Sequence, residues 1–252
     1  MRYGSLALGP DRAAFVELDG ANATVLDAAP WHGGRATEEV IRGFSEADLL
    51  APVAPTKIVC IGRNYAAHAK ELGHEVPAEP LLFLKPPSAL VGPGRAIVRP
   101  SASQRVEHEA ELGVVIGRRC KDVRAEDALS HVLGYTVLCD VTARDLQRKD
   151  VQFTRGKGFD TFCPAGPWIE TVLDPTDVEI TCRVGGVLRQ HGHTRDMIFP
   201  VATLVAYVSA VMTLEPGDVI STGTPEGVGP LLGGDVLEIS ISGIGTLRCP
   251  VV

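Results

Sequence analysis

VEHEAELGVVIG, residues 106–117, has the apolar residues of a buried β-strand, yet it carries two acids, Glu109 and Glu111, two positions apart. Side chains alternate across a strand, so both carboxylates point to one face, while His108 and the apolar residues point to the other. Two ionised carboxylates about 5 Å apart repel each other by roughly 3 kcal/mol in a partly buried site. This face is therefore either solvated or occupied by a cation.

Short apolar runs separated by glycine and proline turns surround this stretch and continue to the end of the chain. Few segments have room for a helix, so the pattern favours an α+β fold that is predominantly β over a doubly wound parallel sheet. The runs that predict strands are LLFLKP, AIVRP, LGYTVLCDVTA, EITCRVGG, GDVISTG and DVLEISISGIGTL, and those that admit helices include RAEDALSHVL, RDLQRK and FPVATLVAYVSAVM.

The first part of the chain differs from the rest. It has two short strand-like pieces and a polar, helix-compatible stretch, TEEVIRGFSEADLL, followed by APVAPT at residues 51–56. Pro52 and Pro55 restrict themselves and the residues before them, so no helix continues through this segment. We expect a small N-terminal domain over residues 1–52 and one larger domain over residues 53–252.

Composition limits the classes of partner. The 252 residues carry a net charge of −7, which argues against binding to nucleic acid or to an anionic membrane surface. No stretch reaches the roughly 18 apolar residues of a membrane span, and no apolar leader follows Arg2, so we expect a cytoplasmic protein. The six cysteines form no CxxC pair, which predicts reduced, buried thiols.

Two further residues favour a cation beside the glutamates. Asp140 ends the apolar run LGYTVLCD, the position from which a strand presents a side chain to a cleft. A third oxygen ligand suits Mg²⁺ or Mn²⁺, with water and substrate completing an octahedron. Lys157 stands between glycines in RGKGFD, where the backbone approaches a ligand closely or makes a surface turn.

The segment NYAAHAKELG predicts a helix with Asn64 as N-cap and Gly73 at its end. His68 and Glu71 are then three residues apart on one face, either as an oriented general base or as an ordinary exposed polar pair. STGTPEGVGP, residues 221–230, lacks the ending of a phosphate-binding loop, but its backbone N–H groups and Thr224 suit a carboxylate.

Taken in order, these motifs resemble the fumarylacetoacetate hydrolase family from about residue 57 to residue 248. The resemblance rests on IGRNYAAHAKELG, LFLKP, HEAELGVVIG, DVTARDLQ, RGKGFD, MIF and STGTPEGVG. It implies a mixed β-sandwich or β-roll catalytic fold, usually a homodimer, in which three carboxylates hold a divalent metal. Carried over residue by residue, the ligands are Glu109, Glu111 and Asp140.

The resemblance also implies roles around the metal. Lys157 lies beside the substrate, Gln147 and Thr224 help to bind it, and His68 with Glu71 forms a catalytic pair on a lid. For an anionic substrate we expect further cationic help from the side chains Arg63 and Lys85.

One departure from the pattern of fumarylacetoacetate hydrolase narrows the class of substrates that we expect. Fumarylacetoacetate hydrolase proper has a further metal-binding aspartate where IGRNY offers Arg63 and Asn64, which favours the shorter branch of isomerases, decarboxylases and acylpyruvases. We expect a small anionic 2-oxo or 2-hydroxydienoic dicarboxylate, with the isomerase/decarboxylase of homoprotocatechuate (aromatic) catabolism leading. Oxaloacetate decarboxylase and acylpyruvate hydrolase are close alternatives. A non-catalytic binding module with a structural metal is the alternative from another class.

Overall fold

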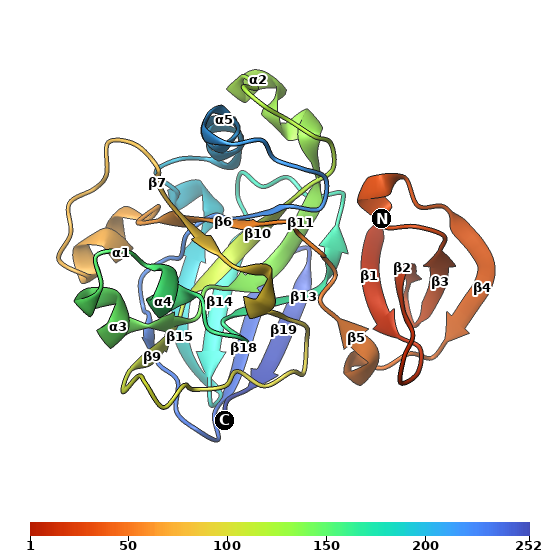
Figure 1. Cartoon of the computed structure of the whole chain (residues 1–252), viewed down its shortest axis with the longest axis horizontal. Coiled ribbons are helices and arrows are strands. Elements are labelled where there is room, and N and C mark those ends of the chain that lie inside the picture. Colours follow the sequence, from red (N-terminus) through yellow and green to blue (C-terminus); the bar gives the residue numbers. More distant parts are fainter.

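The computed structural model describes residues 1–252, which form three β-sheets with short helices at their edges (Figure 1). The largest is a mixed sheet of twelve strands, in which β5 (Leu49–Leu50) pairs with β1 and β8 (Leu90–Val91) pairs with β13. Its main path runs in the spatial order β4 (Ala36–Arg42), β3 (Asn22–Leu26), β2 (Ala13–Asp19), β1 (Arg2–Ala7), β13 (Cys163–Glu170), β11 (Val132–Cys139), β10 (Ala110–Ile116), β16 (Val219–Ser221), β6 (Ile58–Gly62) and β7 (Leu81–Lys85).

The two smaller sheets complete a sandwich. β15 (Val187–His193), β14 (Glu179–Val184), β18 (Val236–Ile241) and β19 (Gly245–Pro250) form a four-stranded sheet that packs against β10, β11 and β13 of the large sheet. Between them lies one apolar core of 47 buried residues. The third sheet has three short strands, β12 (Thr142–Ala143), β9 (Val106–His108) and β17 (Gly229–Pro230). The prediction of an α+β, predominantly β fold is confirmed.

The helices are short. They are α1 (Ala66–Glu71), α2 (Ala125–Ala128), α3 (Arg144–Lys149), α4 (Thr154–Lys157) and α5 (Val201–Val211). All of them except α4 lie in segments that the sequence predicted to admit a helix. None is long and apolar enough to cross a membrane. All six cysteines are buried and unpaired with one another, which confirms the prediction of reduced thiols.

The opening stretch is not one continuous strand. β9 ends at His108 and β10 begins at Ala110, so the chain changes sheets at Glu109. β10 pairs with β11 on one side and with β16 on the other, and both of its faces are covered. Glu109 and Glu111 are 5 % and 2 % exposed, which excludes the solvated-face interpretation.

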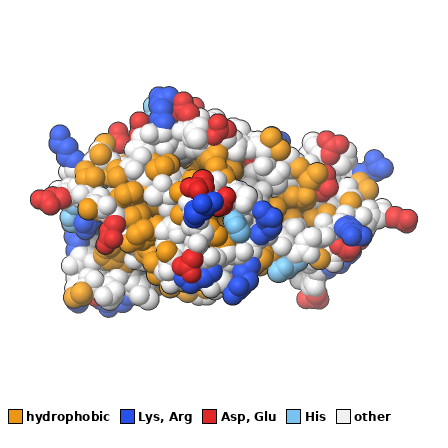
Figure 2. All heavy atoms as spheres, turned by 90° about the horizontal axis from the view of Figure 1, so that it is seen from above, with side chains coloured by type: hydrophobic (Ala, Val, Ile, Leu, Met, Phe, Trp, Pro, Cys, Tyr) orange, Lys and Arg blue, Asp and Glu red, His pale blue; other side chains and the backbone are white.

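The N-terminal strands form a separate group at one end of an elongated molecule (Figures 1 and 2). They enclose a small apolar cluster of Leu6, Val16, Ala23, Val25 and Leu49. The prediction that TEEVIRGFSEADLL is compatible with a helix is wrong in part, because residues 36–42 form strand β4 and pair with β3. β1 continues the large sheet through Arg2 and Tyr3, which pair with Glu170 and Ile169. The division between residues 52 and 53 stays a prediction.

The helix α1 differs from its prediction at one end. Asn64 does not cap it, because the Asn64 amide donates to the carbonyl oxygens of Phe199 and Thr222 and accepts from the Phe199 N–H. Tyr65 precedes the first turn without a side-chain cap. At the other end Gly73 adopts a left-handed φ of 73°, and the hydrogen bonds that close the helix there are those expected of a terminal glycine.

Candidate active site

Three buried carboxylates meet where β9, β10 and β11 come together. Glu109 stands at the break between β9 and β10, Glu111 lies on β10, and Asp140 directly follows β11. The pairing of β10 with β11 and a hydrogen bond of 2.9 Å from the Asp140 N–H to the Glu109 carbonyl hold these segments together. One oxygen from each carboxylate lies within 4.8 Å of the others, a separation that a single cation can bridge.

Buried cations neutralise two of these carboxylates. Lys157 Nζ lies 2.8 Å from Glu109 Oε2 and 2.6 Å from Asp140 Oδ2, and it lies 5.0 Å from the centre of the Phe83 ring. Burial alone would lower the pKa of Lys157, but the Asp140 and Glu109 carboxylates outweigh burial and raise it. In the same way Lys157 and Arg144 outweigh burial and hold the pKa of Glu109 well below its usual range.

Glu111 has no such partner. Its carboxylate accepts hydrogen bonds from two uncharged donors, Ser221 Oγ at 2.5 Å and the Gly223 N–H at 2.7 Å. Burial, Asp140 and Glu109 together raise the pKa of Glu111 to about 8. The cluster therefore has one negative charge that only a proton or an added cation can balance, and its all-oxygen ligand set fits Mg²⁺ or Mn²⁺.

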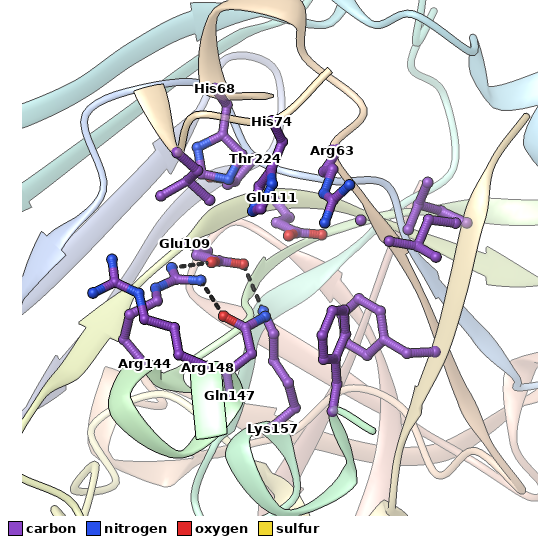
Figure 3. A pocket seen from close by; sticks show the side chains of 16 residues that line it. Arg63, His68, His74, Glu109, Glu111, Arg144, Gln147, Arg148, Lys157 and Thr224 are labelled. Carbon is purple, nitrogen blue, oxygen red and sulfur yellow. Dashed lines mark hydrogen bonds and ion pairs between the residues drawn. The ribbon is translucent and has the colours of Figure 1, made fainter. Parts of the chain in front are cut away.

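A cavity of about 280 Å³ opens onto this cluster (Figure 3). Four cationic side chains line it: Arg63, Arg144, Arg148 and Lys157. Of the other residues predicted for the site, it is also lined by His68, Glu109, Glu111, Gln147 and Thr224. The structure thus gathers, around one cavity, side chains from segments as far apart as residues 63 and 224.

The short helix α3 supplies one wall of the cavity. Its residues Arg144, Gln147 and Arg148 are spaced i, i+3, i+4 and so share one face. Arg144 Nε lies 2.6 Å from Glu107, Nη2 lies 2.5 Å from Glu109, and Nη1 donates to Gln147 Oε1 at 2.6 Å. Gln147 is therefore held in place by a guanidinium that also fixes a candidate metal ligand.

The His68–Glu71 pair stands on α1 above the cavity. His68 is 4 % exposed, and its Nδ1 lies 3.2 Å from Glu71 Oε2. The Glu71 carboxylate also accepts hydrogen bonds from the Gly227 N–H at 3.1 and 3.2 Å. The carboxylate thus orients the imidazole, whose other nitrogen is left for a substrate or a water.

Two predicted substrate contacts differ from expectation in their surroundings. Lys85 is 1 % exposed and does not line the cavity, because its Nζ lies beneath the cluster, 2.5 Å from Asp140 Oδ1 and 3.1 Å from the Val141 carbonyl. Thr224 lines the cavity, but its hydroxyl donates to the Ala110 carbonyl and accepts from Gln190 Nε2. Lys85 is placed to support Asp140, and Thr224 to brace β10.

One family model matches the part of the chain that carries the carboxylate cluster and its cavity. The family model described as fumarylacetoacetate (FAA) hydrolase C-terminal covers residues 57–252, most of the chain and the whole of the site. The chain belongs to the fumarylacetoacetate hydrolase family. The resemblance that the sequence motifs indicated is confirmed.

Three members of the family illustrate its range. A crystal structure of 2-hydroxyhepta-2,4-diene-1,7-dioate isomerase from Mycobacterium marinum is 47 % identical, with a TM-score of 0.90, over 100 % of this chain and 98 % of that one. A mitochondrial oxaloacetate decarboxylase of Dictyostelium discoideum is 46 % identical over 75 % of this chain and 90 % of the relative. Fumarylpyruvate hydrolase from Pseudomonas aeruginosa, in complex with Mn²⁺ and pyruvate, is 38 % identical, with a TM-score of 0.75, over 80 % and 91 %.

Isomerases, decarboxylases and hydrolases therefore all occur in the fumarylacetoacetate hydrolase family, which confirms the prediction that the chain is an enzyme. The family binds divalent metals, and the carboxylate cluster of this member fits such an ion because Glu111 lacks a cationic partner. His108, excluded from the ligand set on strand parity, lies away from the cluster with Nδ1 2.9 Å from Gln190 Oε1.

Three ionisable residues that line the cavity, His74, Arg144 and Arg148, were not among the site residues predicted from the sequence. The RDLQR spacing on a short helix is the signal for both arginines, since it places them beside Gln147. His74 follows the glycine that ends α1 and carries no such signal. Burial and the neighbouring Arg63 guanidinium lower the pKa of His74, which agrees with the cationic character of this end of the cavity.

Proposed function

We propose that this enzyme is a divalent-metal-dependent catalyst acting on 2-oxo or 2-hydroxydienoic dicarboxylates. The leading reactions are isomerisation of 2-hydroxyhepta-2,4-diene-1,7-dioate and decarboxylation of 5-carboxymethyl-2-oxo-hex-3-ene-1,7-dioate. One observation carries the proposal: the cavity joins the three-carboxylate cluster to four cationic side chains. An anionic substrate with two carboxylates matches this distribution of charge.

Glu109, Glu111 and Asp140 are the residues that would hold the metal, as Mg²⁺ or Mn²⁺. When bound there, the ion supplies a Lewis acid for the enolate that forms from a 2-oxo acid. The name of the Pseudomonas aeruginosa relative, in complex with Mn²⁺ and pyruvate, supports this pairing of a divalent ion with a 2-oxo acid.

The protein's own cations divide into two sets. Lys157 and Arg144 are already paired with Glu109, so they stay fixed beside the reacting end of the substrate and stabilise negative charge that develops there. Arg63 and Arg148 line the cavity without an ion pair to any carboxylate of the chain. They are free to bind the second carboxylate of a dicarboxylate, while Gln147, held by Arg144, orients the substrate.

His68 and Glu71 account for proton transfer. In isomerisation the imidazole returns a proton to the dienolate, and in hydrolysis it removes one from water. Glu71 keeps the ring in one orientation, since it is itself fixed by the Gly227 N–H. Decarboxylation depends less on this pair, because the enolate forms there by loss of carbon dioxide.

Oxaloacetate decarboxylation is the second candidate. The Dictyostelium discoideum relative carries that name at 46 % identity over 75 % of this chain. Oxaloacetate has the same 2-oxo acid and second carboxylate in a shorter molecule. Acylpyruvates with a simple acyl group, such as acetylpyruvate, lack the second carboxylate and are the third class to compare.

The test is a substrate panel assayed with Mg²⁺ or Mn²⁺, and again after chelation. 2-Hydroxyhepta-2,4-diene-1,7-dioate, oxaloacetate and an acylpyruvate form the panel, and the two dicarboxylates should have the higher kcat/KM. Glu109→Ala should abolish turnover, whereas Asp150→Asn, outside the cavity, should not. If no 2-oxo acid turns over and chelation lowers only stability, the chain is the metal-stabilised binding module instead.

The homodimer, the cytoplasmic location, the role in aromatic catabolism and the absence of nucleic-acid and membrane partners stay predictions. Light scattering on the purified protein measures the first of these. A mass near twice 26.7 kDa is expected, and a monomer at micromolar concentration would contradict it.

A further inference from the structure

A second group of metal-binding side chains lies on the β14–β15 hairpin, outside the active-site cavity. Glu179, His191 and His193 each offer one ligand atom, and these atoms lie within 4.8 Å of one another. His191 Nε2 is 2.8 Å from Glu179 Oε1, and the two imidazole centres are 5.9 Å apart. No residue of this group lines the cavity of the carboxylate cluster.

The pairing of the hairpin brings the three side chains together. His191 and His193 are two positions apart on β15, so both point to the same side of the sheet. Glu179 on β14 is the direct cross-strand partner of His193. Gln190, one position before His191, is buried and points to the opposite side of the sheet, where it accepts from the Ala110 N–H and donates to Thr224 Oγ1. β15 is an edge strand, and the side chains of Glu179 and His191 are 49 % and 54 % exposed.

A carboxylate outside the group fixes the orientation of one imidazole. Asp177 Oδ1 lies 3.0 Å from His193 Nδ1, and Arg195 Nη1 lies 2.8 Å from Asp177 Oδ2. A hydrogen bond at Nδ1 leaves Nε2 as the ligand nitrogen and makes it more basic, which is the usual arrangement behind a metal-bound histidine.

The surroundings favour a cation as well. His191 also lines a second cavity, together with Asp196 and Glu226. Cross-strand ion pairs explain each His–carboxylate contact separately, but they do not require two imidazoles and a carboxylate to converge within 4.8 Å. An ion placed among the three would replace the proton between His191 and Glu179.

We propose that Glu179, His191 and His193 form a second metal site, which takes a transition ion such as Zn²⁺, Ni²⁺ or Cu²⁺. Two nitrogen ligands and one oxygen ligand suit these ions, with water at the open positions. The all-oxygen cluster of Glu109, Glu111 and Asp140 selects Mg²⁺ or Mn²⁺ instead, so the two sites differ in ligand chemistry. The hairpin site does not depend on the proposed reaction.

Zn²⁺ alone is the probe in the first test, by equilibrium dialysis of the full chain followed by metal analysis. Zn²⁺ also enters carboxylate sites, so the informative quantity is the difference between variants. The double variant His191→Ala/His193→Ala should bind one equivalent less than wild type. Asp177→Asn should weaken Zn²⁺ binding at the hairpin about tenfold, as loss of an orienting carboxylate does. His32→Ala, an exposed histidine elsewhere, is the matched control and should bind like wild type.

Cu²⁺ provides a second readout, because none of the three proposed ligands of the carboxylate cluster is an imidazole. Electron paramagnetic resonance of the Cu²⁺-loaded protein should show coupling to imidazole nitrogen in wild type and His32→Ala, and should lose it in the double variant. Circular dichroism confirms that the variants fold. Equal numbers of Zn²⁺ equivalents in wild type and double variant, or Cu²⁺ spectra without that difference, would overturn the proposal.

Discussion

Replacing Glu111 by Gln tests the charge balance of the carboxylate cluster most directly. Glu111 is buried, its two hydrogen-bond donors are uncharged, and its pKa is raised from 4.5 to about 8. A folded-state pKa above the unfolded one means that stability is complete below about pH 4.5 and is lost as the pH rises toward 8. At about 1.4 kcal/mol per pH unit, the loss in the metal-free protein is on the order of 3 to 5 kcal/mol.

Gln has nearly the same shape, keeps an oxygen for the Gly223 N–H, and cannot ionise. In chelator we therefore expect Glu111→Gln to be slightly less stable than wild type at pH 5 and more stable by a few kcal/mol at pH 8. Urea unfolding at several pH values measures the difference, with exposed Glu38→Gln as the control. Adding Mn²⁺ at pH 8 should then stabilise wild type and leave Glu111→Gln unchanged.

An equal stability difference between wild type and Glu111→Gln in chelator at pH 5 and at pH 8 would contradict this prediction. That result would mean that Glu111 ionises without cost in the folded protein. It would remove the electrostatic argument for a cation at this position.

Three further substitutions extend these tests. Lys85→Met keeps the length of the side chain but leaves Asp140 without one of its two ammonium partners. The free energy of unfolding of the metal-free protein, measured in urea, should therefore fall by about 3 to 5 kcal/mol. A fall of less than about 1 kcal/mol would contradict the supporting role of Lys85. His68→Ala should abolish hydrolysis of an acylpyruvate while the Mn²⁺ dissociation constant, measured by calorimetry, changes less than about threefold, since His68 is not a proposed ligand; a parallel loss of Mn²⁺ binding would reject the assignment. Arg148→Gln should raise KM for oxaloacetate about tenfold, the order expected for the loss of one charged hydrogen bond. KM for an acylpyruvate with a single carboxylate should stay near the wild-type value. Equal changes of KM for both substrates would show that Arg148 does not bind the second carboxylate.

The alternation of side chains along single strands was enough to predict the three carboxylates at the centre of the site. The two-residue spacing of Glu109 and Glu111 and the place of Asp140 at the end of an apolar run are properties of single strands, and they survive in the folded chain. The break between β9 and β10 was not predictable in this way. It depends on pairing of β9 with β12 and β17, which come from distant parts of the chain.

The direction in which a buried charged side chain points also depends on the tertiary structure. Lys85 ends the run LLFLK, and nothing in that run shows whether the ammonium points into the cavity or beneath the carboxylates. Asn64 has a sequence position suitable for capping α1, but its amide is used by Phe199 and Thr222 from other segments. The charges could be named from the sequence, whereas their partners required the fold.

The continuation of the large sheet from β13 into β1 has a consequence for how the chain can be shortened. A core beginning at residue 53 would leave the backbone of Ile169 and Glu170 without the strand that now pairs with them. An uncovered strand edge is a template for pairing with another molecule. The first fifty residues thus cover this edge of β13, and we expect a truncated protein to associate as its concentration rises, whatever its catalytic competence.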